Sequence, residues 1–136
     1  MAKQAPVPDE LSKPFWDACN EHRLVMQTCT ACNMIHFPPK PSCDNCDSKD
    51  NLEWKEMSGR ATIYSYGVMY DSRIRVLQES QPFNIAIVKL EEDPEIIMYS
   101  HLPGVAVDEV PMGAKVKVTF EESSTGQWVP EWELAD

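Results

Sequence analysis

Four cysteines in two close pairs are the strongest constraint on this chain of 136 residues. Cys29 and Cys32 form the first pair and Cys43 and Cys46 the second, with two residues inside each pair and ten between the pairs. Each Cys-x2-Cys turn places two thiolates on one side of a metal ion, so two turns complete a tetrahedral site with no open position for catalysis. The spacing predicts one structural Zn²⁺ per chain, closing a segment too small to build its own core.

Two further observations bear on this metal site. Asn33 and Asp47 each follow the second cysteine of a pair, where the backbone often needs a positive φ that Asn and Asp tolerate well. Disulfides need an oxidising compartment, which nothing in the sequence indicates. Four thiolates also suit a redox iron, so the sequence favours zinc and leaves iron as the alternative metal.

One amphipathic helix is expected upstream of the cysteine pairs, over Asp9–Glu21. Leu11, Phe15 and Cys19 recur every four residues there and predict an apolar stripe. Pro14 is compatible only with the first turn of a helix, so the helix proper should begin near it.

The remainder of the chain predicts β-structure. A strand is expected at 52–57, where Ser58 and Gly59 end it. Residues 103–112 leave room for a turn or one short helix, and Gly67 allows a long strand to bend. Five further strands are expected at residues 60–70, 83–90, 96–102, 115–122 and 127–134.

Five strands in so short a segment predict a small closed or partly open barrel such as an OB-fold, since an immunoglobulin-like sandwich has about seven. The fold class is therefore mainly β. We divide the chain into an N-terminal helical segment (1–23), a metal-binding segment (24–58) and an OB-fold barrel (59–136). The last two are expected to bury separate cores.

Charge and composition exclude several classes of function. Twelve Lys and Arg against 22 Asp and Glu give a net charge of −10, with −3 in residues 1–59 and −7 in residues 60–136. Neither half offers the basic face that nucleic-acid binding needs. No segment reaches the ~18 uncharged apolar residues of a membrane span, and the first residues lack the apolar core of a signal peptide, so a cytoplasmic location is expected.

No set of residues predicts catalysis by the chain alone. Cys19 and His22 would make a nucleophile pair on a helix, but Cys19 more simply continues the apolar stripe. His36 and His101 are single histidines for which a structural role is favoured. The acidic run Glu91–Glu95 lacks the ligand spacing of a Ca²⁺ loop and predicts a charged hairpin tip.

The order of these motifs resembles the zinc-ribbon/OB-fold proteins associated with acyl-CoA metabolism, over nearly the whole chain. Asn33 and Asp47 depart from the Gly that the family often has, and the chain is more acidic than many relatives. The segments that carry the resemblance are Phe15-Trp16, Leu24–Gln27 before the first cysteine pair, Phe37–Pro41 before the second, Leu52–Trp54, and Ser58–Ser65.

The resemblance implies a rubredoxin-like zinc ribbon before the barrel and a role without catalytic residues. Family members commonly accompany thiolase-fold enzymes, among them ketoacyl-CoA thiolases, acyltransferases and lipid-transfer-protein-like aldolases. The resemblance therefore implies that this chain is an accessory subunit in a two-plus-two heterotetramer, where it helps to shape the entrance through which acyl-CoA reaches the active site. The resemblance does not specify the acyl group, and aromatic or arylsuccinyl-CoA substrates are among those compatible with the sequence.

Two groups of residues are candidates for contacts in such a complex. Leu11, Phe15 and Trp16 lie on a helix for which no local core is obvious, so we expect them to face the partner. Arg73 and Arg75 lie between the first two barrel strands, where OB-folds often present ligands, and are candidates for contact with the CoA phosphates.

The alternative function is a free-standing OB-fold module that binds single-stranded nucleic acid. Tyr64, Tyr66 and Tyr70 share one parity of the first barrel strand, and an aromatic row is what base stacking uses. A barrel core or a protein interface uses the same row. Without interleaved basic residues, core or interface is the preferred interpretation.

Overall fold

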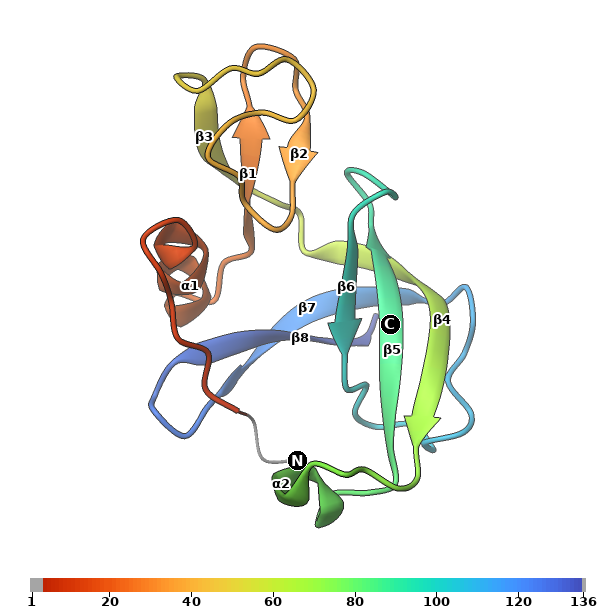
Figure 1. Ribbon diagram of the computed structural model, residues 1–136. Coiled ribbons are helices and arrows are strands. Elements are labelled where there is room, and N and C mark those ends of the chain that lie inside the picture. Colours follow the sequence, from red (N-terminus) through yellow and green to blue (C-terminus); the bar gives the residue numbers. More distant parts are fainter. Residues whose placement is uncertain (1–3, 136) are drawn as a thin grey trace.

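Two antiparallel sheets follow one another along the chain in the computed structural model, which describes residues 4–135 (Figure 1). The first sheet has three strands in the order β2-β1-β3, and the second has five in the order β6-β5-β4-β7-β8. The elements are α1 (Lys13–Asn20), β1 (Val25–Cys29), β2 (Ile35–His36), β3 (Leu52–Glu56), β4 (Arg60–Met69), α2 (Arg75–Gln78), β5 (Phe83–Leu90), β6 (Ile97–Ser100), β7 (Lys115–Glu122) and β8 (Trp128–Leu134).

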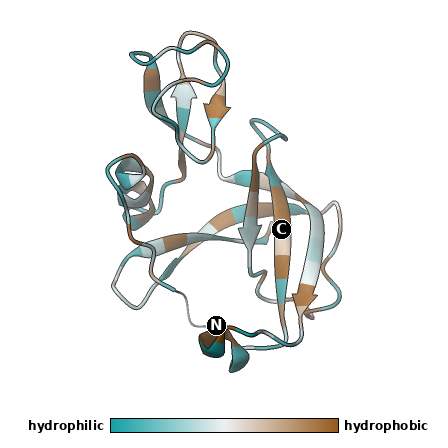
Figure 2. Ribbon diagram, viewed as in Figure 1, coloured by the Kyte–Doolittle hydropathy of each residue, from teal (hydrophilic) through white to brown (hydrophobic). Residues whose placement is uncertain are grey.

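The second sheet curls into a nearly closed barrel, which confirms the predicted fold class. Its two outer strands, β6 and β8, are joined through a buried serine: the Ser100 hydroxyl donates to Glu131 Oε2 at 2.7 Å and accepts from the Trp132 backbone N–H at 2.8 Å. Hydrophobic residues are concentrated on the strands, whereas the hairpin between β5 and β6 is hydrophilic (Figure 2). That hairpin is the acidic tip predicted at Glu91–Glu95.

Most predicted elements are present with small changes in length. β5 and β7 have the predicted bounds, and the helix begins at Lys13, one residue before Pro14, as the proline requires. Residues 103–112 form turns without a helix, while the short α2 lies in a segment predicted as a loop.

The aromatic row predicted on the first barrel strand does not exist, because a register shift between Ile63 and Ser65 breaks the alternation of β4. Tyr64 is consequently exposed, whereas Tyr66 is half-buried against the core and its hydroxyl donates to the Asp108 carbonyl at 2.8 Å. The irregularity falls before Gly67, the predicted bend, which pairs regularly with its neighbour on β5.

The expectation that the ribbon and the barrel bury separate cores is wrong. Leu24 and Met26, at the start of the first sheet, belong to one continuous hydrophobic cluster with barrel residues such as Leu90 and Trp132. Met26 and Trp132 have no exposed surface. A three-stranded sheet has too little apolar surface for a core of its own, so it shares the core of the barrel.

The N-terminal helix α1 also packs on the barrel, which corrects the expectation that its apolar stripe lacks a local core. Phe15 and Cys19 are buried in the shared cluster, and Trp16 packs against it while half-buried. The Gln127 side chain donates to the Trp16 carbonyl at 2.9 Å, which ties the helix to the turn before β8. Of the stripe, only Leu11 is exposed, at 39%.

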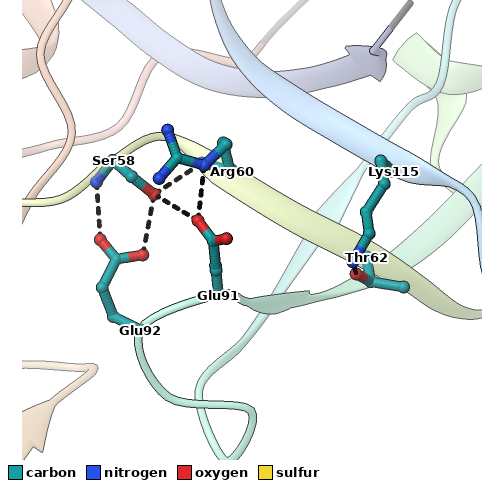
Figure 3. A network of polar contacts seen from close by, with 6 residues as sticks. All are labelled: Ser58, Arg60, Thr62, Glu91, Glu92 and Lys115. Atoms are coloured by element: carbon teal, nitrogen blue, oxygen red, sulfur yellow. Dashed lines mark hydrogen bonds and ion pairs between the residues drawn. The ribbon is translucent and has the colours of Figure 1, made fainter.

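The junction between the two sheets is held by a polar network at Ser58 (Figure 3). Its backbone N–H donates to Glu92 Oε2 at 2.6 Å and its hydroxyl donates to Glu92 Oε1 at 3.0 Å. Arg60 Nε donates to Glu91 Oε2 at 2.6 Å. Gly59 adopts φ +77, and a Cβ there would lie 2.8 Å from Val118 Cγ1, so both backbone and space require glycine.

Within residues 4–135, neither helix has the length and apolar character needed to cross a membrane.

Met26→Ala should destabilise the whole chain because Met26 belongs to the shared core. We expect a loss of about 2–5 kcal/mol in the free energy of unfolding, in a single urea transition seen by both tryptophan fluorescence and circular dichroism. Val7→Ala, at a position 93% exposed, is the control and should change it by less than about 0.5 kcal/mol. Two separate transitions for the unsubstituted chain would contradict the shared core.

Candidate metal centre and barrel surface

The four predicted cysteines come together at the tip of the first sheet. Their Sγ atoms all lie within 4.8 Å of one another. Cys29 and Cys46 are 3.6 Å apart at sulfur, and Cys32 and Cys43 are 3.5 Å apart. A tetrahedron with Zn–S bonds of ~2.3 Å has S–S edges of ~3.8 Å, so these sulfurs lie where zinc ligands would.

The backbone builds the two halves of this site in the same way. Asn33 N–H donates to the Cys29 carbonyl at 2.7 Å, and Asp47 N–H donates to the Cys43 carbonyl at 2.9 Å. Asn33 and Asp47 have φ of +66 and +58, as expected for the residue after each pair. These turns aim both cysteines of each pair at one point, so the site is preorganised by local structure.

The thiols of the site are electrostatically unequal. Hydrogen bonds from the Asn45 side chain and the Met34 backbone lower the pKa of Cys32 to about 6. For Cys46, a hydrogen bond from the Ser48 backbone lowers the pKa, but its contacts with the other three thiols, Cys29 first, and partial desolvation together raise it to about 12. A divalent cation among the sulfurs favours the thiolate form of all of them.

Two histidine-containing pairings considered from the sequence are absent from the described residues. The His22 ring packs on Phe120 and Trp128, with ring centroids 5.4 and 4.4 Å away, and no hydrogen bond joins it to the Cys19 thiol. Burial raises the pKa of Cys19 to about 12, so its thiol stays protonated near neutral pH. His36 is buried on β2, within the zinc ribbon, and does not belong to the cysteine cluster.

Arg73 and Arg75 lie between β4 and β5, at the end of the barrel opposite the first sheet (Figure 1). Both side chains are exposed, and neither makes an ion pair within the described part of the chain. The structure therefore leaves them accessible, and their contact with CoA stays a prediction.

An exposed apolar patch on the outer face of β4, β5 and β6 was not predicted. Tyr64, Ile97 and Tyr99 are 56%, 38% and 63% exposed. They are neighbours because Tyr99 pairs with Ile87 on β5, Ile97 pairs with Lys89, and the Lys89 ammonium lies 4.0 Å from the centroid of the Tyr64 ring. Only strand register brings them together, so no local sequence pattern marks the patch.

A groove of about 510 Å³ lies beside this patch, at the end of the barrel nearest the junction. It was also not predicted. Three basic residues, Arg60, Lys89 and Lys115, line it together with Glu91, Thr62 and apolar groups. These basic residues come from three different strands, which explains why they form no cluster in the sequence.

Together the cysteine cluster and the barrel define a zinc-ribbon/OB-fold protein. Residues 16–53 match the family described as "ChsH2, rubredoxin-like zinc ribbon domain", and residues 54–121 match "ChsH2, C-terminal OB-fold domain". The chain belongs to the ChsH2 (DUF35) family, which confirms the resemblance, and the cysteines form its structural zinc site.

Similar proteins carry names of complex subunits. A "Probable enoyl-CoA hydratase alpha subunit" of Thermomonospora curvata is 31% identical over 85% of this chain, which spans only 35% of that relative. A "DUF35 domain-containing scaffold protein" of Methanothermobacter thermautotrophicus is 28% identical over 74% of each chain. The solved structure of an "Ltp2-ChsH2(DUF35) aldolase" contains a chain that is 27% identical, with a TM-score of 0.84 over 97% of this chain and 100% of that one.

Purified protein should contain one zinc ion per chain. Cys43→Ser should lose it and unfold the zinc ribbon, because a closed four-ligand site supplies folding free energy. Elemental analysis of protein prepared without chelator measures the metal. Cys19→Ala is the matched control and should keep its zinc, because Cys19 lies outside the cluster. A full complement of iron, or zinc retained by Cys43→Ser, would contradict the assignment.

The Cys19 thiol should resist alkylation in the folded protein at pH 8. Its pKa of about 12 leaves it protonated there, and its side chain has no exposed surface. Iodoacetamide followed by peptide mass spectrometry should modify Cys19 only after denaturation. Rapid modification of Cys19 in the native, zinc-loaded chain would contradict this and would support Cys19 as a nucleophile.

Proposed function

We propose that this protein is a non-catalytic accessory subunit of a thiolase-superfamily enzyme that acts on acyl-CoA. Membership of a family whose relatives include scaffold proteins and a component of an aldolase complex carries this proposal. The partner proposed is a thiolase-fold subunit, itself a symmetric dimer, which gives a two-plus-two assembly. The substrate class proposed for the complex is acyl-CoA, and aromatic and arylsuccinyl-CoA thioesters are among the candidates. The proposed location of the complex is the cytoplasm.

The described residues support a role without catalysis by the chain alone. The zinc site is closed by four cysteines, and Cys19 is buried and protonated. The paired carboxylates at the hairpin tip, Glu91 and Glu92, are occupied by the junction network with Ser58 and Arg60. We therefore propose that the chain organises a site whose reacting groups belong to the partner.

Among the exposed apolar surfaces of residues 4–135, we propose two for the partner. The first is the surface predicted on α1. Because Phe15 is buried, this surface consists of Leu11 and the half-buried Trp16. The second is the patch of Tyr64, Ile97 and Tyr99, which is larger in exposed aromatic surface. Aromatic residues are enriched at the buried centres of protein interfaces, which supports the patch as the principal contact.

Nucleic-acid binding, the alternative, has lost its main support. The bulge in β4 turns Tyr66 towards the core, so the three tyrosines do not form a stacking platform. The net charge of −10 disfavours a polyanionic partner in any case.

Co-expression with the thiolase-fold proteins of the same organism tests this function. We expect co-elution in size-exclusion chromatography, acyl-CoA turnover by the complex and none by this chain alone. Tyr99→Asp should release the partner while the zinc content and the circular dichroism spectrum stay unchanged, because Tyr99 is exposed.

Leu11→Asp tests the helix surface in the same way, and Val7→Asp is the control at an exposed position outside both surfaces. Independent elution of the unsubstituted chain from every candidate, with unchanged activity of each, would refute the subunit function. Release by Leu11→Asp and not by Tyr99→Asp would move the interface to α1.

A further inference from the structure

We infer that the groove beside the junction binds a phosphate-bearing small molecule with an apolar portion, of the kind represented by the nucleotide end of acyl-CoA. The inference rests on the proposed function for the identity of this ligand, and on the groove itself for its chemistry. The groove is about 510 Å³, within the ~300–1,000 Å³ typical of ligand sites.

The strand register places two lysines on either side of one hydroxyl group. Thr62 on β4 pairs with Lys89 on β5 and with Lys115 on β7, so the three side chains form a row across the sheet on one face. Directly paired residues lie ~5 Å apart, so both long side chains reach the space above Thr62. The Lys115 ammonium already lies 3.3 Å from Thr62 Oγ1 (Figure 3).

The charges of this row are unbalanced. Arg60, at the rim, is neutralised by Glu91. Lys89 and Lys115 make no ion pair with a carboxylate among residues 4–135; Lys89 contacts the Tyr64 ring and Lys115 the Thr62 hydroxyl. In a chain with 22 acidic residues and 12 basic ones, two lysines without an ion pair in one groove give a local positive charge. An anion between them would accept charge-assisted hydrogen bonds from both.

Glu91 also lines the groove, where it is paired with Arg60. The remaining lining is apolar, so the groove favours more than a bare anion. Leu90, Pro94, Val116 and Ala135 contribute to its lining. Ligand sites characteristically combine such apolar surface with a few polar groups that orient the ligand. A nucleotide has both parts, with phosphates for the lysines and a flat base for the apolar surface.

This site differs from the one predicted at Arg73 and Arg75. Those side chains lie at the opposite end of the barrel (Figure 1), whereas the groove adjoins the apolar patch through Lys89 and Tyr64. A ligand in the groove would consequently lie at the edge of the proposed partner surface. The two positions are far enough apart to be tested separately.

The test is isothermal titration calorimetry of the full zinc-loaded chain with 3′,5′-ADP, CoA and inorganic phosphate, each in a separate titration. We expect 3′,5′-ADP and CoA to bind with similar affinity, and inorganic phosphate at least about tenfold more weakly because it lacks the apolar portion. Lys89→Ala and Lys115→Ala should each weaken 3′,5′-ADP binding about tenfold, and the double variant should abolish it.

Lys55→Ala is the matched control, since it removes one exposed positive charge from β3, away from the groove. It should leave binding unchanged. Three results would each refute the groove as the binding site. These are no nucleotide binding by the unsubstituted chain, binding that survives in the double lysine variant, and loss of binding in Arg73→Ala and Arg75→Ala. Equal affinity for inorganic phosphate would overturn the nucleotide class.

The same variants distinguish this inference from the proposed function. If the lysine variants co-elute normally with the partner but lose 3′,5′-ADP, both the groove and the subunit function stand. If the unsubstituted chain binds no nucleotide and the lysine variants lose the partner, the lysines contact an acidic protein surface and the ligand inference is wrong. If the unsubstituted chain forms the complex but binds no nucleotide, the groove inference is refuted and the subunit function stands.

Discussion

The cross-link between two cysteine turns is the constraint on which the N-terminal half depends. Cys29 ends β1, the strand that also carries Met26 into the shared core. The metal site therefore holds one end of β1 while hydrophobic burial holds the other. A three-stranded sheet of this size lacks the buried area to fold alone, so it needs both the metal and the barrel.

The shared core has a consequence for the proposed role of the protein as an accessory subunit. Helix α1, the zinc ribbon and the barrel are joined by one hydrophobic cluster and by the network that links Ser58 to Glu92. A unit joined in this way presents surfaces from different segments in a constant geometry. That is the property a subunit needs if it shapes a partner's site without contributing reacting groups.

The surface of the barrel concentrates features that the overall composition conceals. The chain is strongly acidic, yet Lys89 and Lys115 line one groove, and the Lys89 ammonium lies over the exposed ring of Tyr64. Net charge describes the average potential around a protein and does not describe one groove. The acidic balance argues against nucleic acid as a partner and remains compatible with a local anion site.

The sequence by itself determined the zinc site and the fold class. The spacing of Cys29, Cys32, Cys43 and Cys46 and the period-two runs of the strands depend on contacts between near neighbours, which sequence patterns record directly. Only the tertiary structure decided three other features: the burial of Phe15, the orientation of Tyr66, and the row of Lys89, Thr62 and Lys115. Each depends on strand register or on packing between segments distant in the chain. One bulge residue reverses the faces of a strand, and no local periodicity reports it.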